Sequence, residues 1–102
     1  MAGSAREFFE SLEGRPAPAS IAGTRASYRF DVEGAGSWRV DLADGELTVA
    51  EAGEGGDCVI RLKENVLLRL LRGEQNPITA FMTGKITVDG DMTLALKLKD
   101  LF

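Results

Sequence analysis

Alternating apolar and polar positions in the middle of the chain predict three consecutive strands. Apolar side chains fall at every second position in residues 26–32, 38–42 and 47–49. The stretches 34–36 and 43–45, which separate these runs, contain glycine and are short. A strand with one buried face has a period of two, and short glycine-containing connections favour hairpins. The pattern therefore predicts an antiparallel meander.

Apolar positions at helical spacing flank this meander. Ser4-Ala5-Arg6-Glu7 has the form of a capping box and predicts a helix that ends at Gly14. Its expected buried face consists of Ala5, Phe8, Phe9 and Leu12. Residues 57–63 alternate again and predict a fourth strand. The stripe that follows predicts a second helix closed by Gly73, and its members are Val66, Leu67, Leu70 and Leu71.

The last third of the chain is divided by glycines into short segments. Asn76 before a proline is a helix start and Gly84 is a C-cap, so a helix is expected over residues 77–83. Residues 85–89 alternate and predict a fifth strand. The run 92–98 is ambiguous, because its leucines fit both a strand and one face of a helix. Periodicity alone leaves both readings open.

These elements predict one domain of the α+β class over residues 1–102. A chain of 102 residues with 44% hydrophobic content is sufficient for a single core. We expect a five-stranded, mostly antiparallel sheet that includes the meander. A helix between the fourth and fifth strands must pack on the sheet, so the helices are expected to cover one of its faces.

Composition argues against catalysis. The chain contains no histidine and a single cysteine, Cys58, so the usual general base and the usual zinc ligands are missing. Cys58 lies among apolar strand residues, which predicts an inert thiol rather than a nucleophile. We therefore expect a protein that is not an enzyme and that uses no metal or other cofactor.

The charge balance argues against nucleic acid as a partner. Residues 1–57 carry 11 acidic and 5 basic side chains, and residues 58–102 carry 5 acidic and 7 basic ones. The net charge of −4 does not provide the basic surface that phosphate neutralisation needs. The basic residues of the second half predict a solvated face, or at most transient contact with anionic lipid head groups. No apolar run is long enough to span a membrane and none resembles a signal peptide, so the expected location is cytoplasmic.

The order of residues in the last third resembles the sterol carrier protein 2 (SCP2) domain, a small lipid-binding fold. The residues that carry this likeness are Asn76-Pro77, Ala80-Phe81-Met82, Gly84-Lys85, Val88, Gly90-Asp91-Met92, Leu94-Ala95 and Lys97-Leu98, and upstream Gly36-Ser37-Trp38, Asp44-Gly45 and Asp57 to Ile60. The likeness extends from Phe8 to Phe102. It implies that the last run is a helix capped near Asp91. On that helix Leu96 points away from the main stripe, where it could meet a ligand, a partner or a membrane. It also implies an internal tunnel for an acyl chain or a sterol-like body, which the last helix helps to close.

The expected function is reversible, non-catalytic binding of a hydrophobic molecule: a sterol, a fatty acid, an acyl-coenzyme A or another lipid. Such a pocket needs apolar walls from several elements and few polar groups. The candidate wall residues are Trp38, Leu67, Leu70, Leu71, Ile78, Phe81, Met82, Met92, Ala95 and Leu98. Ordinary core packing is the alternative for each of them. Phe81, Met82 and Met92 rank first, because they flank glycines where the last helices could move.

A second hypothesis is an interaction or dimerisation module, accessory to a lipid-metabolising enzyme, with little or no lipid binding. An enclosed cavity predicts a monomer that binds lipid stoichiometrically. An exposed apolar patch predicts a weak homodimer or a complex with a partner enzyme. A third, weaker hypothesis is a domain whose pocket is filled by its own side chains.

Overall fold

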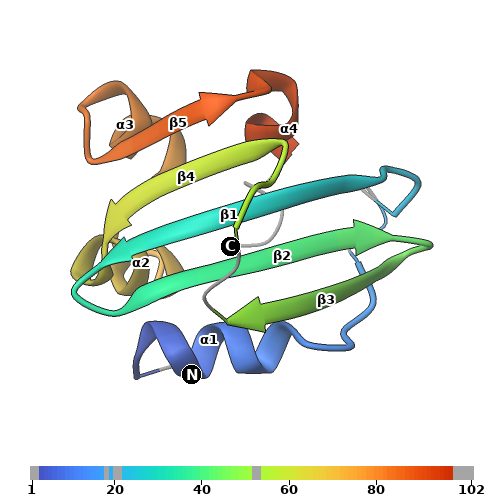
Figure 1. The fold of residues 1–102 in the computed structure, drawn as a ribbon. Helices are drawn as coiled ribbons and strands as arrows, with labels where there is room; N and C mark the ends of the chain where they lie inside the picture. The colour runs from blue at the N-terminus through green and yellow to red at the C-terminus, as the bar shows by residue number, and fades with distance from the viewer. Residues whose placement is uncertain (1–2, 18, 20–21, 52–53, 98–102) are drawn as a thin grey trace.

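The computed structural model describes residues 3–17, 19, 22–51 and 54–97, which form one sheet and the helices packed on it (Figure 1). In chain order the elements are α1 (Ala5–Leu12), β1 (Ala26–Glu33), β2 (Gly36–Ala43), β3 (Glu46–Glu51), β4 (Cys58–Lys63), α2 (Glu64–Leu71), α3 (Pro77–Met82), β5 (Ile86–Gly90) and α4 (Met92–Lys97). The strands lie in the order β3-β2-β1-β4-β5. β1 and β4 run parallel, and every other neighbouring pair runs antiparallel. The predicted α+β class and mostly antiparallel sheet are confirmed.

The first three strands form the meander that the alternating pattern predicts. Val40 of β2 pairs with Tyr28 of β1 on one side and with Val49 of β3 on the other. The β2–β3 connection turns at Asp44 and Gly45, where φ is 54° and 77°. A two-residue type I′ hairpin requires a positive φ at both central positions, and Asp-Gly adopts it readily.

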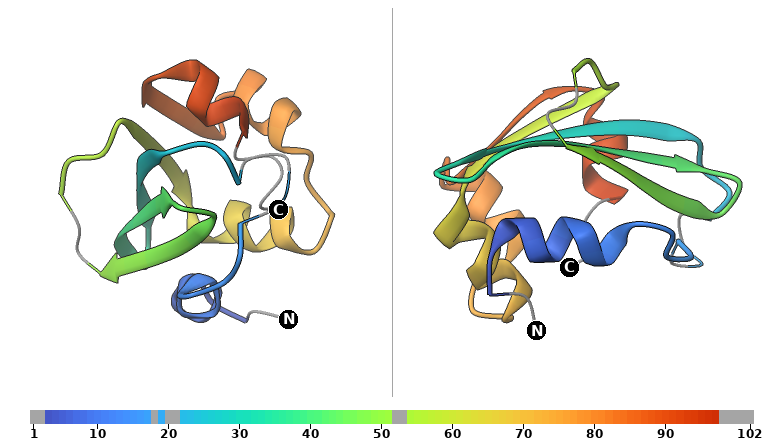
Figure 2. Two further views of the ribbon diagram at one scale, coloured as in Figure 1. Left: turned by 90° about the vertical axis from the view of Figure 1, so that its right-hand side faces the viewer. Right: turned by 60° about the horizontal axis from the view of Figure 1, so that its bottom comes forward.

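The described helices all lie on one face of the sheet (Figure 2). Along β1, β2 and β4 the side chains that point toward the helices are almost all apolar and buried, as a period of two requires. Phe9 of α1 stacks on Trp38, with ring centroids 4.7 Å apart, and lies 5.2 Å from the ring of Phe30. α1 therefore fills the core beneath the β1–β2 half of the sheet.

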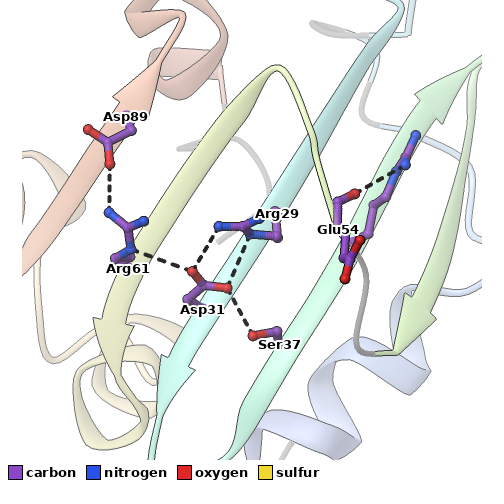
Figure 3. Close-up of polar contacts among 7 residues, drawn as sticks. Arg29, Asp31, Ser37, Glu54, Arg61 and Asp89 are labelled. Atoms are coloured by element: carbon purple, nitrogen blue, oxygen red, sulfur yellow. Dashed lines mark hydrogen bonds and ion pairs between the residues drawn. The ribbon is translucent and has the colours of Figure 1, made fainter.

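The opposite face of the sheet carries oppositely charged side chains on adjacent strands (Figure 3). Arg61 Nη1 lies 2.6 Å from Asp89 Oδ2, and Arg61 Nε lies 3.5 Å from Asp31 Oδ2. Asp31 also pairs with Arg29 at 3.3 Å and accepts a hydrogen bond from Ser37 Oγ at 2.9 Å. Exposed ion pairs contribute little stability. Their main effect here is to balance the charge of an open sheet face.

Polar side chains cap both C-terminal helices. Asn76 Oδ1 accepts hydrogen bonds from the backbone N–H groups of Ile78 and Thr79 at 2.9 and 3.1 Å. Asp91 Oδ1 accepts one from the N–H group of Thr93 at 2.9 Å and thereby begins α4. The closing run is therefore a helix, as the resemblance implies. The boundaries of β4, α3 and β5 differ from the predicted ones by one residue.

Candidate functional site

An apolar cavity lies between the sheet and the helices α2, α3 and α4. Its volume is about 90 Å³, measured as the space open to the centre of a water-sized sphere. β1, β4 and β5 supply one side, and the three helices supply the other. Twelve residues line it, and all of them are apolar: Phe30, Ile60, Leu62, Leu70, Pro77, Ile78, Phe81, Ile86, Val88, Met92, Ala95 and Leu96.

The mouth of the cavity is formed by α3 and α4. On the sheet side Phe30 and Leu62 are buried. On the helix side Ile78, Met92 and Leu96 are 50%, 42% and 60% exposed. In the described part of the chain, every large hydrophobic side chain that is exposed belongs to α3 or α4. Exposed apolar surface in the described part of the chain is thus concentrated on these two helices.

The size of the cavity limits what it holds without rearrangement. A single buried water needs about 10–15 Å³ by this measure, so about 90 Å³ accommodates several water molecules or a stretch of hydrocarbon chain.

α4 is the least buried of the three helices that line the cavity, because α2 and α3 each contain at least one buried residue. None of its residues is buried, and it packs on the core through the half-buried Leu94 and Ala95. Hydrogen bonds attach it to the sheet and to the chain just before β1: Tyr28 Oη donates to the Leu94 carbonyl at 3.1 Å, the Asp91 N–H donates to the Asp57 carbonyl at 3.2 Å, and Lys97 Nζ donates to Thr24 Oγ1 at 3.2 Å. Segments with little buried apolar surface open most readily. α4 is therefore the wall that we expect to move first.

The hydrogen bond from Tyr28 leads to a prediction about stability at high pH. Burial, together with the nearby Cys58, Asp91 and Asp57, raises the pKa of Tyr28 to about 12. Because the folded state favours the neutral phenol, protonated Tyr28 contributes to the free energy of unfolding. This contribution is fully present below pH 10 and is lost as the pH rises from 10 to about 12. We expect Tyr28→Phe to lower the free energy of unfolding by about 1 kcal/mol at neutral pH and to lack this alkaline loss. Urea unfolding across the range tests this, and an equal alkaline loss in both proteins would contradict it.

The structure brings five of the ten predicted wall residues together: Leu70, Ile78, Phe81, Met92 and Ala95 line the cavity. The others lie elsewhere or outside the described residues. Trp38 and Leu67 are buried in the core, where Trp38 stacks on α1. Leu71 is half-buried against the core, and Met82 is 78% exposed on the outer side of α3. Leu98 lies outside the described residues. Trp38 and Leu67 differ from the prediction because an apolar core residue and a cavity residue have the same sequence pattern.

Seven lining residues were not among the ten predicted wall residues: Phe30, Ile60, Leu62, Pro77, Ile86, Val88 and Leu96. Five of them are strand residues on the inward face of β1, β4 and β5. The alternation of apolar positions identified that face. It contained no sign that β5 would pair with β4, which places Ile86 and Val88 beside Leu62 and Ile60.

The single cysteine in the chain, Cys58, is in a poor position to act as a nucleophile. Cys58 is completely buried, and this burial, with Asp91 and Asp57 nearby, raises the pKa of its thiol. A protonated, inaccessible thiol is a poor nucleophile. Among the described residues, no three metal-ligating side chains lie close enough together to hold a metal ion.

We expect Cys58 to stay unlabelled by a mild thiol reagent at neutral pH while the protein is folded. It should react promptly once the protein is unfolded in urea, because the thiol is then exposed and its pKa returns to the ordinary range. The measurement is absorbance after addition of a chromogenic disulfide. Prompt labelling of the folded protein would contradict this and would show that the core opens easily around Cys58, at the start of β4.

Comparison with known proteins agrees with this architecture. A family model described as the SCP-2 sterol transfer family matches residues 8–102. The chain belongs to this family. Membership supports lipid binding in general terms. In the described part of the chain, no helix is both long enough and apolar enough to cross a membrane.

Individual SCP-2 relatives differ greatly in length. Hydroxysteroid dehydrogenase-like protein 2 of Danio rerio is 33% identical over 107 residues, which cover 98% of this chain and 25% of that protein. Sterol carrier protein 2 of Gallus gallus is 39% identical over 66 residues, or 64% of this chain and 12% of that protein. The solution structure of the sterol carrier protein domain 2 of Helicoverpa armigera superimposes with a TM-score of 0.68 at 31% identity, covering 93% of this chain and 82% of that one. This chain thus spans about a quarter of the dehydrogenase-like relative.

Proposed function

We propose that this SCP-2 domain reversibly binds the hydrocarbon part of a lipid in the cavity between β4, β5 and the helices α2, α3 and α4. The observation that carries the proposal is a cavity lined only by apolar side chains, with an exposed apolar mouth. The role is binding and carriage without catalysis. We place it in the cytoplasm, as the sequence leads us to expect.

Burial of the chain provides the driving force. Each methylene group transferred from water into an apolar site contributes about 0.8 kcal/mol, or about fourfold in affinity. Affinity for a series of straight-chain alcohols should therefore rise with length and level off once the cavity is full. A bound chain also stabilises the folded state by mass action, since the cavity replaces part of the packed interior.

Native mass spectrometry of protein purified without detergent tests the proposal. We expect a monomer that carries one lipid-sized adduct, which extraction then identifies. Its affinity for decanol is measured separately on delipidated protein. A dimer without adduct that also refuses decanol, fatty acids and sterols would overturn the proposal and would favour an interaction module instead.

A further inference from the structure

The two edges of the sheet differ in how they are protected. β3 forms one edge and β5 forms the other (Figure 1). The chain after α1 covers the edge of β3: Leu47 N–H donates to the Arg15 carbonyl at 3.0 Å, and the Leu47 carbonyl accepts from Gly14 N–H at 2.9 Å. Val49 N–H donates to the carboxylate of Glu13. Proteins usually cover an edge strand in this way, because open backbone groups invite pairing with another strand.

The edge of β5 has no such cover in the described part of the chain. In an antiparallel pair, alternate residues direct both of their backbone groups to the partner strand. Asp91 N–H donates to the Asp57 carbonyl at 3.2 Å, and this pair continues the β4–β5 register. Thr87 and Asp89, which alternate with Asp91, therefore face β4. The residues whose N–H and C=O groups point away from β4 are Ile86, Val88 and Gly90. No described residue forms a backbone hydrogen bond with these outward groups, which we call the free edge.

A second copy of β5 fits the free edge in antiparallel orientation. Val88 is the midpoint of β5, which runs from Ile86 to Gly90. Because the backbone groups of Val88 point outward, placing it opposite Val88 of a second copy aligns the two strands over their whole length. The outward groups of one copy then meet those of the other, which gives about six backbone hydrogen bonds. This arrangement has twofold symmetry, the commonest symmetry of homo-oligomers.

The side chains are compatible with this register. Thr87 lies opposite Asp89 of the second copy, and each Asp89 is already compensated by Arg61 of its own chain at 2.6 Å (Figure 3). Just beyond the strand ends, Lys85 lies opposite Asp91. Among the described residues, Lys85 donates only to a neutral amide, at 3.3 Å. Opposite charges across neighbouring strands stabilise the pairing, and like charges destabilise it. This register supplies Lys85 with a carboxylate and places no like charges directly opposite each other.

Pairing through β5 also covers exposed apolar surface. α3 precedes β5 in the chain and α4 follows it directly. These two helices carry the exposed large hydrophobic side chains of the described residues, which are Ile78, Phe81, Met82, Met92 and Leu96. In the antiparallel pair the start of one β5 lies beside the end of the other, and a twofold axis perpendicular to the sheet keeps all helices on one face. α3 of each copy is therefore brought toward α4 of the other, and burial of their apolar side chains favours association.

We propose that β5 is a homodimerisation edge, through which two copies of this chain pair antiparallel and form one continuous sheet. The inference concerns the free edge rather than the cavity, so it does not depend on the proposed function. A strand of five residues flanked by short helices forms a small interface, and small interfaces associate weakly. We expect a dissociation constant of about 0.1–1 mM, so that the protein is monomeric at the micromolar concentrations of native mass spectrometry.

Sedimentation equilibrium of delipidated protein tests the proposal. We expect the wild-type mass to rise from that of a monomer at about 10 μM toward that of a dimer at about 2 mM. Thr87→Asp places a carboxylate opposite Asp89 of the second copy, on both sides of the twofold axis, and should raise the dissociation constant at least about tenfold. Within its own chain the new carboxylate lies opposite Arg61, so the fold should keep its stability. The control Ala50→Asp adds the same charge opposite Arg39 on the protected edge strand β3 and should dimerise as the wild-type protein does.

Amide hydrogen exchange locates the interface. Protection of the Val88 and Gly90 N–H groups should rise with protein concentration, because dimerisation gives them acceptors. The N–H groups of Thr87 and Asp89 face β4 and should be protected equally at low and high concentration. A monomer at every concentration would overturn the inference and leave the free edge to a strand of another protein. A dimer that Thr87→Asp and Ala50→Asp weaken equally, or one without added protection at Val88, would also overturn it.

Discussion

Replacing Ala95 with phenylalanine is expected to lower the affinity for decanol by at least about 100-fold without unfolding the protein. Ala95 lies on α4, is half-buried and lines the cavity. An aromatic ring at this position occupies space that the ligand chain needs. Exclusion of three to four methylene groups, at about 0.8 kcal/mol each, accounts for a loss of this size. Isothermal titration measures the affinity, and urea unfolding verifies the fold.

The same substitution on the outer surface provides the control. Ala50 lies on β3, an edge strand, and is exposed far from the cavity. Ala50→Phe should bind decanol as the wild-type protein does. If Ala95→Phe retained full affinity, the chain would be bound somewhere other than the cavity.

Replacing Gly90 with alanine should lower the free energy of unfolding by about 3 kcal/mol or more. Gly90 ends β5 with φ of 107°, a region that L-residues rarely adopt. A Cβ atom there would overlap the carbonyl oxygen of Asp57 and come within 3.2 Å of Cys58 Cα. The strained φ alone costs about 1–3 kcal/mol, and both neighbours are backbone atoms that cannot rotate away. A domain of this size has only about 5–15 kcal/mol of stability, so the loss is substantial.

Gly73 separates the two contributions to this loss. Its φ is 75°, but a Cβ atom there would meet nothing within 4 Å. Gly73→Ala therefore carries the conformational cost alone, about 1 kcal/mol. Urea unfolding of both variants gives the comparison. Equal losses would show that the Gly90–Asp57 contact does not constrain the passage from β5 into α4.

The elements of this fold were predictable where local chemistry acts within a few residues. Alternating apolar positions predicted β1, β2 and β3, and Asp44-Gly45 predicted the hairpin between the last two. The form of α4 was not predictable from periodicity, because its leucines fit both a strand and a helix. The cap at Asp91 is local and begins the helix. The close approach of Gly90 to Asp57, which fixes the chain just before α4, joins residues far apart in the sequence.

The candidate site was predictable only in part, because the sequence does not show which apolar side chains leave space unfilled between the sheet and the helices. Leu67 and Leu70 belong to the same stripe of α2, yet only Leu70 faces the cavity. Trp38 was an expected wall residue, but Phe9 of α1 stacks on it and occupies that space. The pairing of β5 with β4 places the cavity beside α3 and α4, and this pairing depends on the whole sheet.

Intermolecular nuclear Overhauser effects from isotope-labelled decanol test the central claim most directly. They report which side chains lie beside the bound chain. Binding in the cavity predicts effects to Leu70, Ile78 and Phe81, and weak or no effects to Met82, which lies on the outer side of α3. Effects confined to Met82 would contradict the account and would place the ligand on the surface. Effects confined to Trp38, which packs against α1, would also contradict it and would place the ligand in a different part of the core.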